Sequence, residues 1–465
     1  MSLTKVSYSM IEGAVVNVLD FGADPTGVAD STAAIQAAVD SIVQGTVYFP
    51  NGTYKITNTI NVDCSTKLTL NLRGNGRATI IKYEGTTPNI PMVYYQKGGN
   101  TAFSIIENLT FENNFRTGDT VLNAISAIRI GEKNALAVDG GNGTCNITIR
   151  KNLILYAQRC IEIFSESDQI TIEDNYLFVF TEHGILCTIA GPLVVSGTQS
   201  AAVRVLNNQI SGAQQDAVNV RLSGSACTVQ GNVIQSVKRM MGIHLVNCSA
   251  FRVSDNYFES LLLNTNLNYA VLSEGSFAGY IGDLQIGGYA GANLIIIDAN
   301  SHDINIGTNY HASSGGNPLS FVDVNAAATG ISIIGKQFSD GLLTNDIVGL
   351  PDFQVDGNGN LTSSTSVKAP LVTSKQTFEN VAGAGSFTMF TAVANGCYLV
   401  NVSQEEEDYA ATAVVTVIGN TATVNVNSIY STNANLSITA TGLDVKVNNG
   451  IAATRTVYYG FIRIA

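Results

Sequence analysis

Charged residues, proline and tryptophan are scarce in this chain of 465 residues, and each shortage excludes a class of protein. Only 13% of the residues are charged while 45% are hydrophobic, which excludes a disordered chain and indicates a long buried core. The 8 prolines are few beside 44 glycines, so we expect tight turns rather than linkers, because glycine adopts positive φ angles and keeps its backbone donor. Lys and Arg number 24 against 36 Asp and Glu, which argues against nucleic acid as a partner, since basic side chains supply most phosphate binding.

Signals for membranes, export and metals are also missing from the sequence. No apolar run approaches the roughly 20 residues that a membrane-spanning helix needs, so we expect no membrane insertion. The opening segment, MSLTKVSYSM, lacks the basic stretch followed by an apolar one that marks an export signal. The seven cysteines are single, without a CxxC pair, and no nucleotide-binding motif occurs, so we expect buried thiols, no cofactor and no metal site.

A sequence motif that occurs in five copies is the main feature of the middle of the chain. In each copy an alternating apolar segment leads to an asparagine and then to another apolar residue, which predicts a strand, a sharp corner and a second strand. The copies are NITIRKNLI from Asn146, QITIEDNYL from Gln169, VRVLNNQI from Val203, CTVQGNVI from Cys227 and FRVSDNYF from Phe251.

The asparagines of these copies measure the repeat. Asn152, Asn175, Asn208, Asn232 and Asn256 are separated by 23, 33, 24 and 24 residues. A nearly constant period in this range indicates stacked units that cannot bury their apolar faces alone, so we predict a β-solenoid. The asparagines would form a structural ladder at one corner, and the nine extra residues of the long interval would project as a loop beside the barrel.

The first part of the chain resembles a known family. The passage VVNVLDFGADPTGVADSTAAIQAAVDS followed by GTVYFPNGTYKI is similar to the opening segment of pectate-lyase-like right-handed parallel β-helices, especially the bacteriophage tailspike polysaccharide depolymerases. The resemblance covers about residues 15–60 closely and extends at the level of fold to about residue 340. It implies a homotrimer on a virion tail that binds, and usually cleaves, a bacterial surface polysaccharide.

We divide this all-β chain into four segments. Residues 1–45 hold a first strand and a helix that we expect to cap the open end of the solenoid, and residues 46–345 form the parallel β-helix. Residues 346–374 are polar and rich in turns, as in a stem or linker. Residues 375–465 alternate in short strands, which predicts a β-sandwich that serves as a trimerisation module. The apolar stripe of the capping helix is Ile35, Ala38, Val39 and Ile42.

Equivalent positions of stacked copies become neighbours in space, because the rungs of a parallel solenoid rise by about 4.8 Å. Counted from the corner asparagine, one inward-facing column contains Ile161, Ile185, Val218 and Ile243. The outward-facing column beside it contains Glu162, Leu186, Asn219 and His244. A second outward column lies just before the strand, with Glu182 beside it, and contains Arg159, His183, Asp216 and Met241.

Carboxylates and basic side chains converge on this outward face, which makes it the predicted active site. Hydrolysis of a glycosidic bond commonly needs one protonated and one ionised carboxyl group. We predict Glu182 and Asp216 as this catalytic pair, with Glu162 in reserve, because neighbouring rungs would separate them by roughly 5 to 9 Å. Simple surface polarity is the alternative interpretation of both residues.

Five residues are predicted to bind substrate: Arg159, His183, Asn219, His244 and Tyr156. Arg159 would hold one carboxylate ionised or bind an anionic sugar, and His183 and His244 would orient hydroxyl groups. Tyrosine must supply any aromatic platform for a sugar ring, because the chain contains no tryptophan.

Two other functions fit the same residues. A polysaccharide lyase of this fold would use Arg159, His183 and Tyr156 as charge neutraliser and base, because a lyase removes the proton beside a uronate carboxylate. A non-catalytic receptor-binding appendage would grip its glycan without cutting it. The solenoid begins close to Met1, so we expect attachment to the virion through a short element, or a trimmed chain.

Overall fold

The computed structural model describes a repetitive β-structure and a separate C-terminal unit. The chain divides into two compact units, Met1–Val348 and Gly349–Ala465. Within the first unit the described residues are 15–96, 103–113, 126–131, 146–164, 167–188, 200–213, 217–236, 241–260, 269–287, 293–312, 320–333, 337–339 and 345–348. Within the second unit they are 354–355, 361–362, 386–391, 396–404, 410–418, 421–430, 436–441, 444–449 and 457–463.

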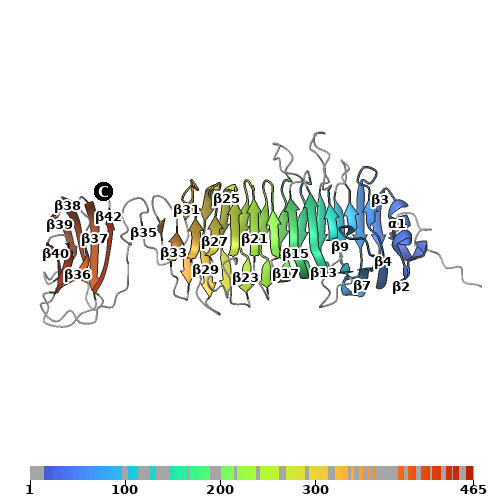
Figure 1. The fold of residues 1–465 in the computed structure, drawn as a ribbon, viewed down its shortest axis with the longest axis horizontal. Coiled ribbons are helices and arrows are strands. Elements are labelled where there is room, and N and C mark those ends of the chain that lie inside the picture. Colours follow the sequence, from blue (N-terminus) through green and yellow to red (C-terminus); the bar gives the residue numbers. More distant parts are fainter. Residues whose placement is uncertain are drawn as a thin grey trace, which may run out of the picture. The chain divides into compact units, whose positions relative to one another are not determined.

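The first unit is a right-handed parallel β-solenoid, in agreement with the sequence (Figure 1). From the second rung onward, each rung contributes one strand to each of three parallel columns, which we call sheets 1, 2 and 3. Sheet 1 has 12 strands: β1 (Val16–Asn17), β3 (Gln44–Tyr48), β6 (Thr69–Arg73), β9 (Ser104–Glu107), β12 (Ile147–Arg150), β14 (Thr171–Glu173), β16 (Arg204–Leu206), β19 (Thr228–Gln230), β22 (Arg252–Ser254), β25 (Phe277–Gly282), β28 (His302–Ile306) and β31 (Ser332–Ile333).

Sheets 2 and 3 merge into one hydrogen-bonded array of 21 strands, because β13 (Leu153–Phe164) and β15 (Tyr176–Thr188) run through both. The other strands of sheet 2 are β2 (Thr26–Asp30), β4 (Gly52–Ile56), β7 (Thr79–Tyr83), β10 (Thr110–Asn113), β17 (Gln209–Ala213), β20 (Val233–Ser236), β23 (Tyr257–Ser260), β26 (Leu284–Gly287), β29 (Asn309–Ala312) and β32 (Gln337–Ser339). The other strands of sheet 3 are β5 (Ile60–Val62), β8 (Pro91–Tyr95), β11 (Ser126–Ile130), β18 (Val218–Leu222), β21 (Met241–Val246), β24 (Tyr269–Glu274), β27 (Asn293–Ile297), β30 (Ser320–Val324) and β33 (Asn345–Val348).

The core is built from stacked aliphatic columns. In sheet 3, Ile161 pairs with Ile185, Ile185 with Val220, and Val220 with Ile243, and all four side chains are fully buried. Each buried branched side chain removes its apolar surface from water and contributes about 1.5 to 3 kcal/mol to stability. The sequence correctly placed three members of this column, but Val218 was wrong for the third rung, where Val220 stands.

The corner between sheets 1 and 2, which we call the Asn corner, has the predicted ladder. The side-chain Oδ1 of Asn175 accepts hydrogen bonds from the backbone nitrogen and Nδ2 of Asn152, at 3.0 and 3.1 Å. Asn208, Asn232 and Asn256 repeat the arrangement on the following rungs. These asparagines are almost completely buried, so the ladder satisfies backbone donors that would otherwise be lost inside the fold.

A left-handed residue precedes each ladder asparagine and makes the turn. The φ angles of Lys151, Asp174, Asn207 and Asp255 are 54°, 55°, 54° and 58°, and Gly231 takes the same place with a φ of 69°. Asp, Asn and Gly adopt this conformation at low cost, which explains their recurrence just before the corner asparagine in the sequence.

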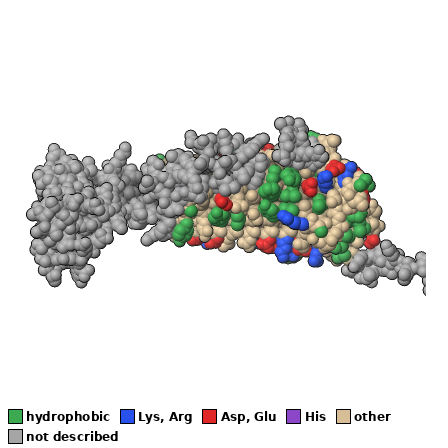
Figure 2. Space-filling view, turned by 90° about the horizontal axis from the view of Figure 1, so that it is seen from below, with side chains coloured by type: hydrophobic (Ala, Val, Ile, Leu, Met, Phe, Trp, Pro, Cys, Tyr) green, Lys and Arg blue, Asp and Glu red, His purple; other side chains and the backbone are tan. Residues whose placement is uncertain are grey.

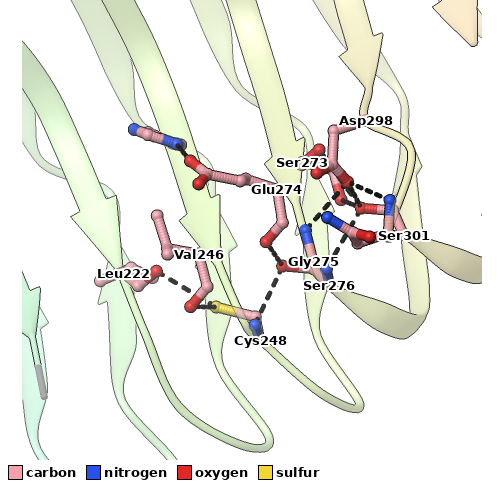
Figure 3. A network of polar contacts seen from close by, with 11 residues as sticks. Leu222, Val246, Cys248, Ser273, Glu274, Gly275, Ser276, Asp298 and Ser301 are labelled. Carbon is pink, nitrogen blue, oxygen red and sulfur yellow. Dashed lines mark hydrogen bonds and ion pairs between the residues drawn. The ribbon is translucent and has the colours of Figure 1, made fainter. Parts of the chain in front are cut away.

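A second, shorter ladder closes the corner between sheet 3 and sheet 1 (Figure 3). The Ser276 hydroxyl accepts from the backbone nitrogen of Cys248 at 2.9 Å, and the Ser301 hydroxyl accepts from the backbone nitrogen of Ser276 at 3.1 Å. Asp298 accepts from the Ser301 hydroxyl at 2.7 Å and from the backbone nitrogen of Gly275 at 2.9 Å. The later rungs are therefore held at two corners by side chains that take up backbone donors.

The N-terminal part contains the helix α1 (Thr32–Asp40) and the short 3-10 helices η2 (Val18–Phe21) and η3 (Gly76–Ala78). Helix α1 lies at the first rungs of the solenoid (Figure 1) and buries Ile35, Ala38 and Val39. Its Gln36 amide exchanges two hydrogen bonds with the backbone of Asn61 in β5. We retain capping of the open solenoid end as the proposed role of this helix.

The C-terminal unit is described through its strands. A hairpin pairs β34 (Gln354–Val355) with β35 (Leu361–Thr362). A three-stranded antiparallel sheet contains β36 (Ser386–Thr391), β41 (Asp444–Asn449) and β40 (Leu436–Thr441). A four-stranded antiparallel sheet contains β39 (Thr421–Tyr430), β38 (Ala410–Ile418), β37 (Gly396–Gln404) and β42 (Val457–Arg463). The β-sandwich, its role in trimerisation and the stem at residues 346–374 remain predictions, and most of the stem lies outside the described residues.

Two expectations from composition concern the described part of the chain. The described cysteines of the solenoid are free and buried, as expected: Cys64, Cys160, Cys187, Cys227 and Cys248. Among the described residues, no helix has the length and hydropathy needed to cross a lipid bilayer.

Candidate functional site

The outer face of sheet 3 brings together most of the predicted site residues. Arg159 and His183 are register partners on β13 and β15, as the repeat predicts. Three residues further along each strand, a second outward column contains Arg129, Glu162, Leu186, Arg221 and His244. Side chains of these two columns extend over the same face, so charged groups from five rungs meet there.

On the rung that follows Asn208, the third of the five repeat copies, the observed register differs from the predicted one. His183 pairs with Val218, which occupies the position assigned from sequence to Asp216, while Asp216 itself lies outside the described residues. Arg221, rather than Asn219, follows Leu186 in the outward column. The alignment slipped by two residues on this rung, because the segment between sheets 2 and 3 is longer there than on the rungs before it.

Asn219 points into the barrel and not outward as predicted. Its side chain is fully buried, its Nδ2 donates to the backbone oxygen of Met241 at 3.0 Å, and its Oδ1 has no hydrogen-bond partner. Gly184 lies opposite, and a Cβ there would come within 2.6 Å of the Asn219 backbone oxygen. Asn219 therefore contacts the core beneath the site rather than the surface where substrate would bind.

A chain of alternating charges crosses the first rungs of the site. Glu162 is completely buried, and its carboxylate accepts from Arg129 Nε at 2.7 Å and from Arg159 Nη1 at 2.5 Å. Arg159 Nε also pairs with Glu182 Oε2 on the next rung. The Arg129 guanidinium lies 5.9 Å from the ring of Tyr94 and 5.6 Å from that of Phe164, which fixes it over an aromatic floor.

The environment of Glu162 keeps its carboxyl group ionised. Burial acts to raise its pKa, but Arg129, Ser126 and Arg159 outweigh burial, so the pKa is lowered. A general acid must be protonated at the working pH. Glu162, the reserve member of the predicted carboxylate pair, is thus suited to holding two arginines and not to protonating a leaving group.

Glu182 stands at a β-bulge. Ala157 pairs with Phe180 and Arg159 with His183, so β15 has one residue more than β13 over this stretch. The extra residue swings the Glu182 side chain toward Arg159, and Gln158 Nε2 also donates to it at 3.2 Å. Its side chain is 40% exposed, which leaves the carboxylate accessible to solvent. Bulges are common beside active sites because they re-aim a side chain.

His183 is neutral at ordinary pH. Burial lowers its pKa first, and the positive charges of Arg159 and Arg221 lower it further, to about 3. Its side chain is only 15% exposed, and its Nδ1 is buried without a hydrogen-bond partner at 3.9 Å from Glu182 Oε2. The imidazole is therefore unprotonated between two guanidinium groups and has a ring nitrogen that can accept a proton, although so low a pKa makes it a weak base.

The next rungs add a cation and a histidine–carboxylate pair. Arg221 forms none of the salt bridges found among the described residues of this face. His244 Nε2 lies 2.9 Å from Glu274 Oε2. Burial lowers the pKa of His244, although its bond to Glu274 opposes that change. Tyr269 packs edge-on against His244, with ring centroids 6.2 Å apart, and burial raises the pKa of its phenol.

Tyr156 lies at the bend of β13 where the strand passes from sheet 2 to sheet 3. Its φ angle is 59°, and Val179 takes the same left-handed conformation at the matching bend of β15, with a φ of 56°. A bulky or branched residue adopts this conformation only under constraint from its surroundings. The backbone at Tyr156 thus sets the direction in which β13 crosses the site.

Three residues to which the sequence assigned no specific role complete the face. Arg129 belongs to an insertion whose surroundings, such as residues 132–145, lie outside the described residues. Arg221 and Glu274 lie on β18 and β24, strands whose distance from the corner asparagine varies. The signal for Arg221 was present in the alternation of VRL, in which this arginine lies between the buried Val220 and Leu222. No group of three or more His, Cys, Asp or Glu side chains among the described residues is arranged to hold a metal ion.

A family model described as "Rhamnogalacturonase A/epimerase, pectate lyase-like" matches residues 15–239. A curated relative, Mannuronan C5-epimerase AlgE1 of Azotobacter vinelandii, is 39% identical over 107 residues. That match covers 21% of this chain and 8% of the relative, so the chain spans a small part of that protein's length.

Solved structures share the fold. DFA-IIIase from Arthrobacter chlorophenolicus A6 aligns with a TM-score of 0.52 at 12% identity, covering 71% of this chain and 93% of that one. The tailspike protein of Acinetobacter baumannii phage AM24 aligns with a TM-score of 0.45 at 14% identity, covering 97% of this chain and 83% of that one. The first similarity establishes a common β-helical architecture and leaves the chemistry to the residues of the site.

Proposed function

From the premise that residues 15–239 carry a pectate lyase-like β-helix, we propose that this protein is an enzyme that acts on a bacterial surface polysaccharide. The outer face of sheet 3 is its active site. We further propose that the bond-breaking step begins with removal of a proton beside the carboxylate of a uronic acid. The observation that supports this chemistry best is the neutral His183 between Arg159 and Arg221.

The proposed step needs a base and a cation. The Nε2 of His183 takes the proton from C5 of the sugar, while its Nδ1 faces Glu182. Arg221 binds the carboxylate on C5 and stabilises the negative charge that develops there. The electron pair of the C–H bond forms a double bond between C4 and C5, the glycosidic bond at C4 breaks, and the departing oxygen takes a proton from water. Arg159, held by Glu162 and Glu182, keeps His183 unprotonated beforehand.

Hydrolysis is the second candidate. Glu182 supports it, because its carboxylate is the most exposed acid of the first rungs of the site and stands on a bulge. The partner assigned from sequence, Asp216, lies outside the described residues. Glu162 is unsuited as the acid, since its two arginines hold it ionised.

The products distinguish these reactions. We expect the protein, incubated with its cognate polysaccharide, to release oligosaccharides with an unsaturated end that absorbs in the ultraviolet. New reducing ends without this absorbance would replace the proposal with hydrolysis. Uptake of deuterium from heavy water at C5 without cleavage would indicate an epimerase. If the protein binds the polymer but does not alter it, the interpretation that remains is a non-catalytic receptor-binding appendage.

Its biological setting is part of the same proposal. The opening segment of the chain resembles those of tailspike depolymerases, which supports a homotrimer on a virion tail that acts outside the cell at the bacterial surface. Electron microscopy of virions labelled with an antibody to the protein tests the location. Sedimentation of the full chain tests the trimer.

A further inference from the structure

A line of tyrosine and glutamine side chains runs along the outer face of sheet 2. Register pairs connect one position on six successive strands, from β15 to β29. The residues at this position are Tyr176, Gln209, Val233, Tyr257, Gln285 and Tyr310. This surface, which we call the tyrosine column, belongs to a different sheet from the candidate active site.

The column points away from the core. Its neighbours in sequence on each strand are buried, among them Leu177, Ile210, Ile234 and Phe258, so the strand alternation sends the column residues outward. Tyr257 is 37% exposed and Tyr310 is 49% exposed, which is unusual for large aromatic residues. Figure 2 shows hydrophobic side chains gathered in patches on one surface of the described part, with charged groups scattered among them.

The spacing of the column suits a chain of sugar rings. Strands stack at about 4.8 Å, close to the length that one pyranose adds to an extended polysaccharide, so six rungs span roughly 24 Å. Aromatic rings pack against the apolar C–H faces of sugars, and amide side chains exchange hydrogen bonds with hydroxyl groups. Aromatic and amide side chains are both present in the column, and it contains no charged residue.

The residues two positions further along the same strands add aromatic and polar groups to this surface. Phe178 packs against Tyr176, with ring centroids 5.7 Å apart, which broadens the aromatic surface at the first of these rungs. Further along, Gln235 donates to Glu259 at 2.7 Å, which fixes both polar groups beside Tyr257. A carboxylate and an amide held in place beside a ring are suited to sugar hydroxyl groups.

We infer that the tyrosine column is a second, non-catalytic polysaccharide-binding face that takes uncharged stretches of the polymer, lying along the solenoid axis. The inference rests on the proposed function for the identity of the polymer. It differs from that function in its residues, because the tyrosine column contacts the chain through ring stacking, whereas the active site uses Arg221 and His183.

The test starts from a printed array of purified bacterial capsular and O-antigen polysaccharides. The full-length protein, carrying His183→Gln to stop turnover, selects the polymer that it retains. Its affinity for that polymer is then compared with a variant that also carries Tyr176→Gln, Tyr257→Gln and Tyr310→Gln. We expect the triple change to weaken binding about a hundredfold, since each stacked ring contributes about threefold to tenfold.

Matched variants separate ring stacking from loss of structure. Changing the same three tyrosines to phenylalanine keeps the rings and should retain at least a third of the affinity. Phe277→Ala removes a ring of similar exposure from sheet 1, and should leave binding unchanged. Circular dichroism and thermal melting check that every variant folds, and the changes are on the surface, where substitution costs little stability.

The outcomes distinguish failure of the second binding face from failure of the proposed enzyme. The second binding face is overturned if the triple glutamine variant keeps its affinity. The proposed enzyme is unaffected by that result if a protein with the same three changes, but with His183 retained, still cleaves the polymer. A loss of binding in a protein that never alters its polymer supports the tyrosine column and overturns the enzyme. A change in sedimentation, with affinity unchanged, means that a second copy of this chain covers the column instead. Failure to retain any polysaccharide overturns both proposals.

Discussion

The Asn corner and the corner between sheets 2 and 3 differ in how strictly they repeat. At the Asn corner, the five rungs from Asn152 to Asn256 each use one left-handed residue and one asparagine. From that asparagine to the first outward column of sheet 3, successive rungs use 7, 8, 10, 9 and 13 residues. The constant Asn corner keeps successive rungs in the same stacked arrangement. The variable corner between sheets 2 and 3 changes which side chains reach the outer face of sheet 3, and it does so without disturbing the core.

The largest effect is expected from a substitution on sheet 3, which follows the variable corner. His183→Gln removes the proposed base and should lower kcat by about a thousandfold, because loss of a positioned general base commonly costs a hundredfold to ten-thousandfold. Ultraviolet absorbance of the released ends measures the rate. His302→Gln, a change of the same kind on sheet 1, should leave kcat as it is, and an equal loss in both variants would contradict the role of His183.

A change on the constant side should act on stability instead. Asn208→Ala deletes an amide that accepts two hydrogen bonds from Asn175 and donates to Ile172 and Asn232, so buried groups lose partners. We expect the free energy of unfolding to fall by about 3 kcal/mol in chemical denaturation, with kcat of the folded protein retained. Asn305→Ala, on the exposed side of β28, should change it by less than about 0.5 kcal/mol. A loss below about 1 kcal/mol for Asn208 would remove the ladder as a stabilising element.

The third prediction concerns pH. Burial and Arg159 lower the pKa of His183 most, and Arg221→Gln removes a further positive charge that lowers it, so that pKa should rise from about 3. Since protonated His183 cannot accept a proton, kcat/KM of the variant should begin to fall at a higher pH than that of the unaltered protein when the pH is lowered. We also expect KM to rise about tenfold, because Arg221 binds the substrate carboxylate. Arg204→Gln on sheet 1 is the control, and coincident pH profiles would count against the assignment.

The smallest expected effect is the contribution of His183 to acid sensitivity. Its folded pKa of about 3 lies below the ordinary value of 6.5, so below pH 6.5 the unfolded chain binds a proton that the folded chain does not. The stability that depends on neutral His183 is therefore complete above pH 6.5 and declines as pH falls toward 3. Denaturation at pH 7 and pH 5 should show a decline about 2 kcal/mol smaller in His183→Gln than in the unaltered protein. Equal declines would show that the imidazole is protonated in the folded state.

The same comparison explains what the sequence could predict. The solenoid, the Asn ladder and the partnership of Arg159 with His183 follow from fixed spacing, because local turn chemistry makes every Asn corner alike. The predicted pair of Glu182 and Asp216 depended on counting across the variable corner, where two further residues on the third rung moved Val218 into the expected place. Pairing of Glu162 with Arg129 joins residues 33 apart across an insertion, which no repeat could signal.

The Asn ladder has a consequence for the order in which the protein forms. Four of the asparagines, from Asn152 to Asn232, satisfy their backbone nitrogen through the amide of the next rung toward the C-terminus, as Asn208 does through Asn232. A nascent chain leaves the ribosome N-terminus first, so every corner waits for the rung that follows, 24 residues later in this case. At ordinary rates of translation that delay lasts roughly one to five seconds. During synthesis, the newest rung is therefore always an unfinished edge, and the solenoid matures one step behind its own growing end.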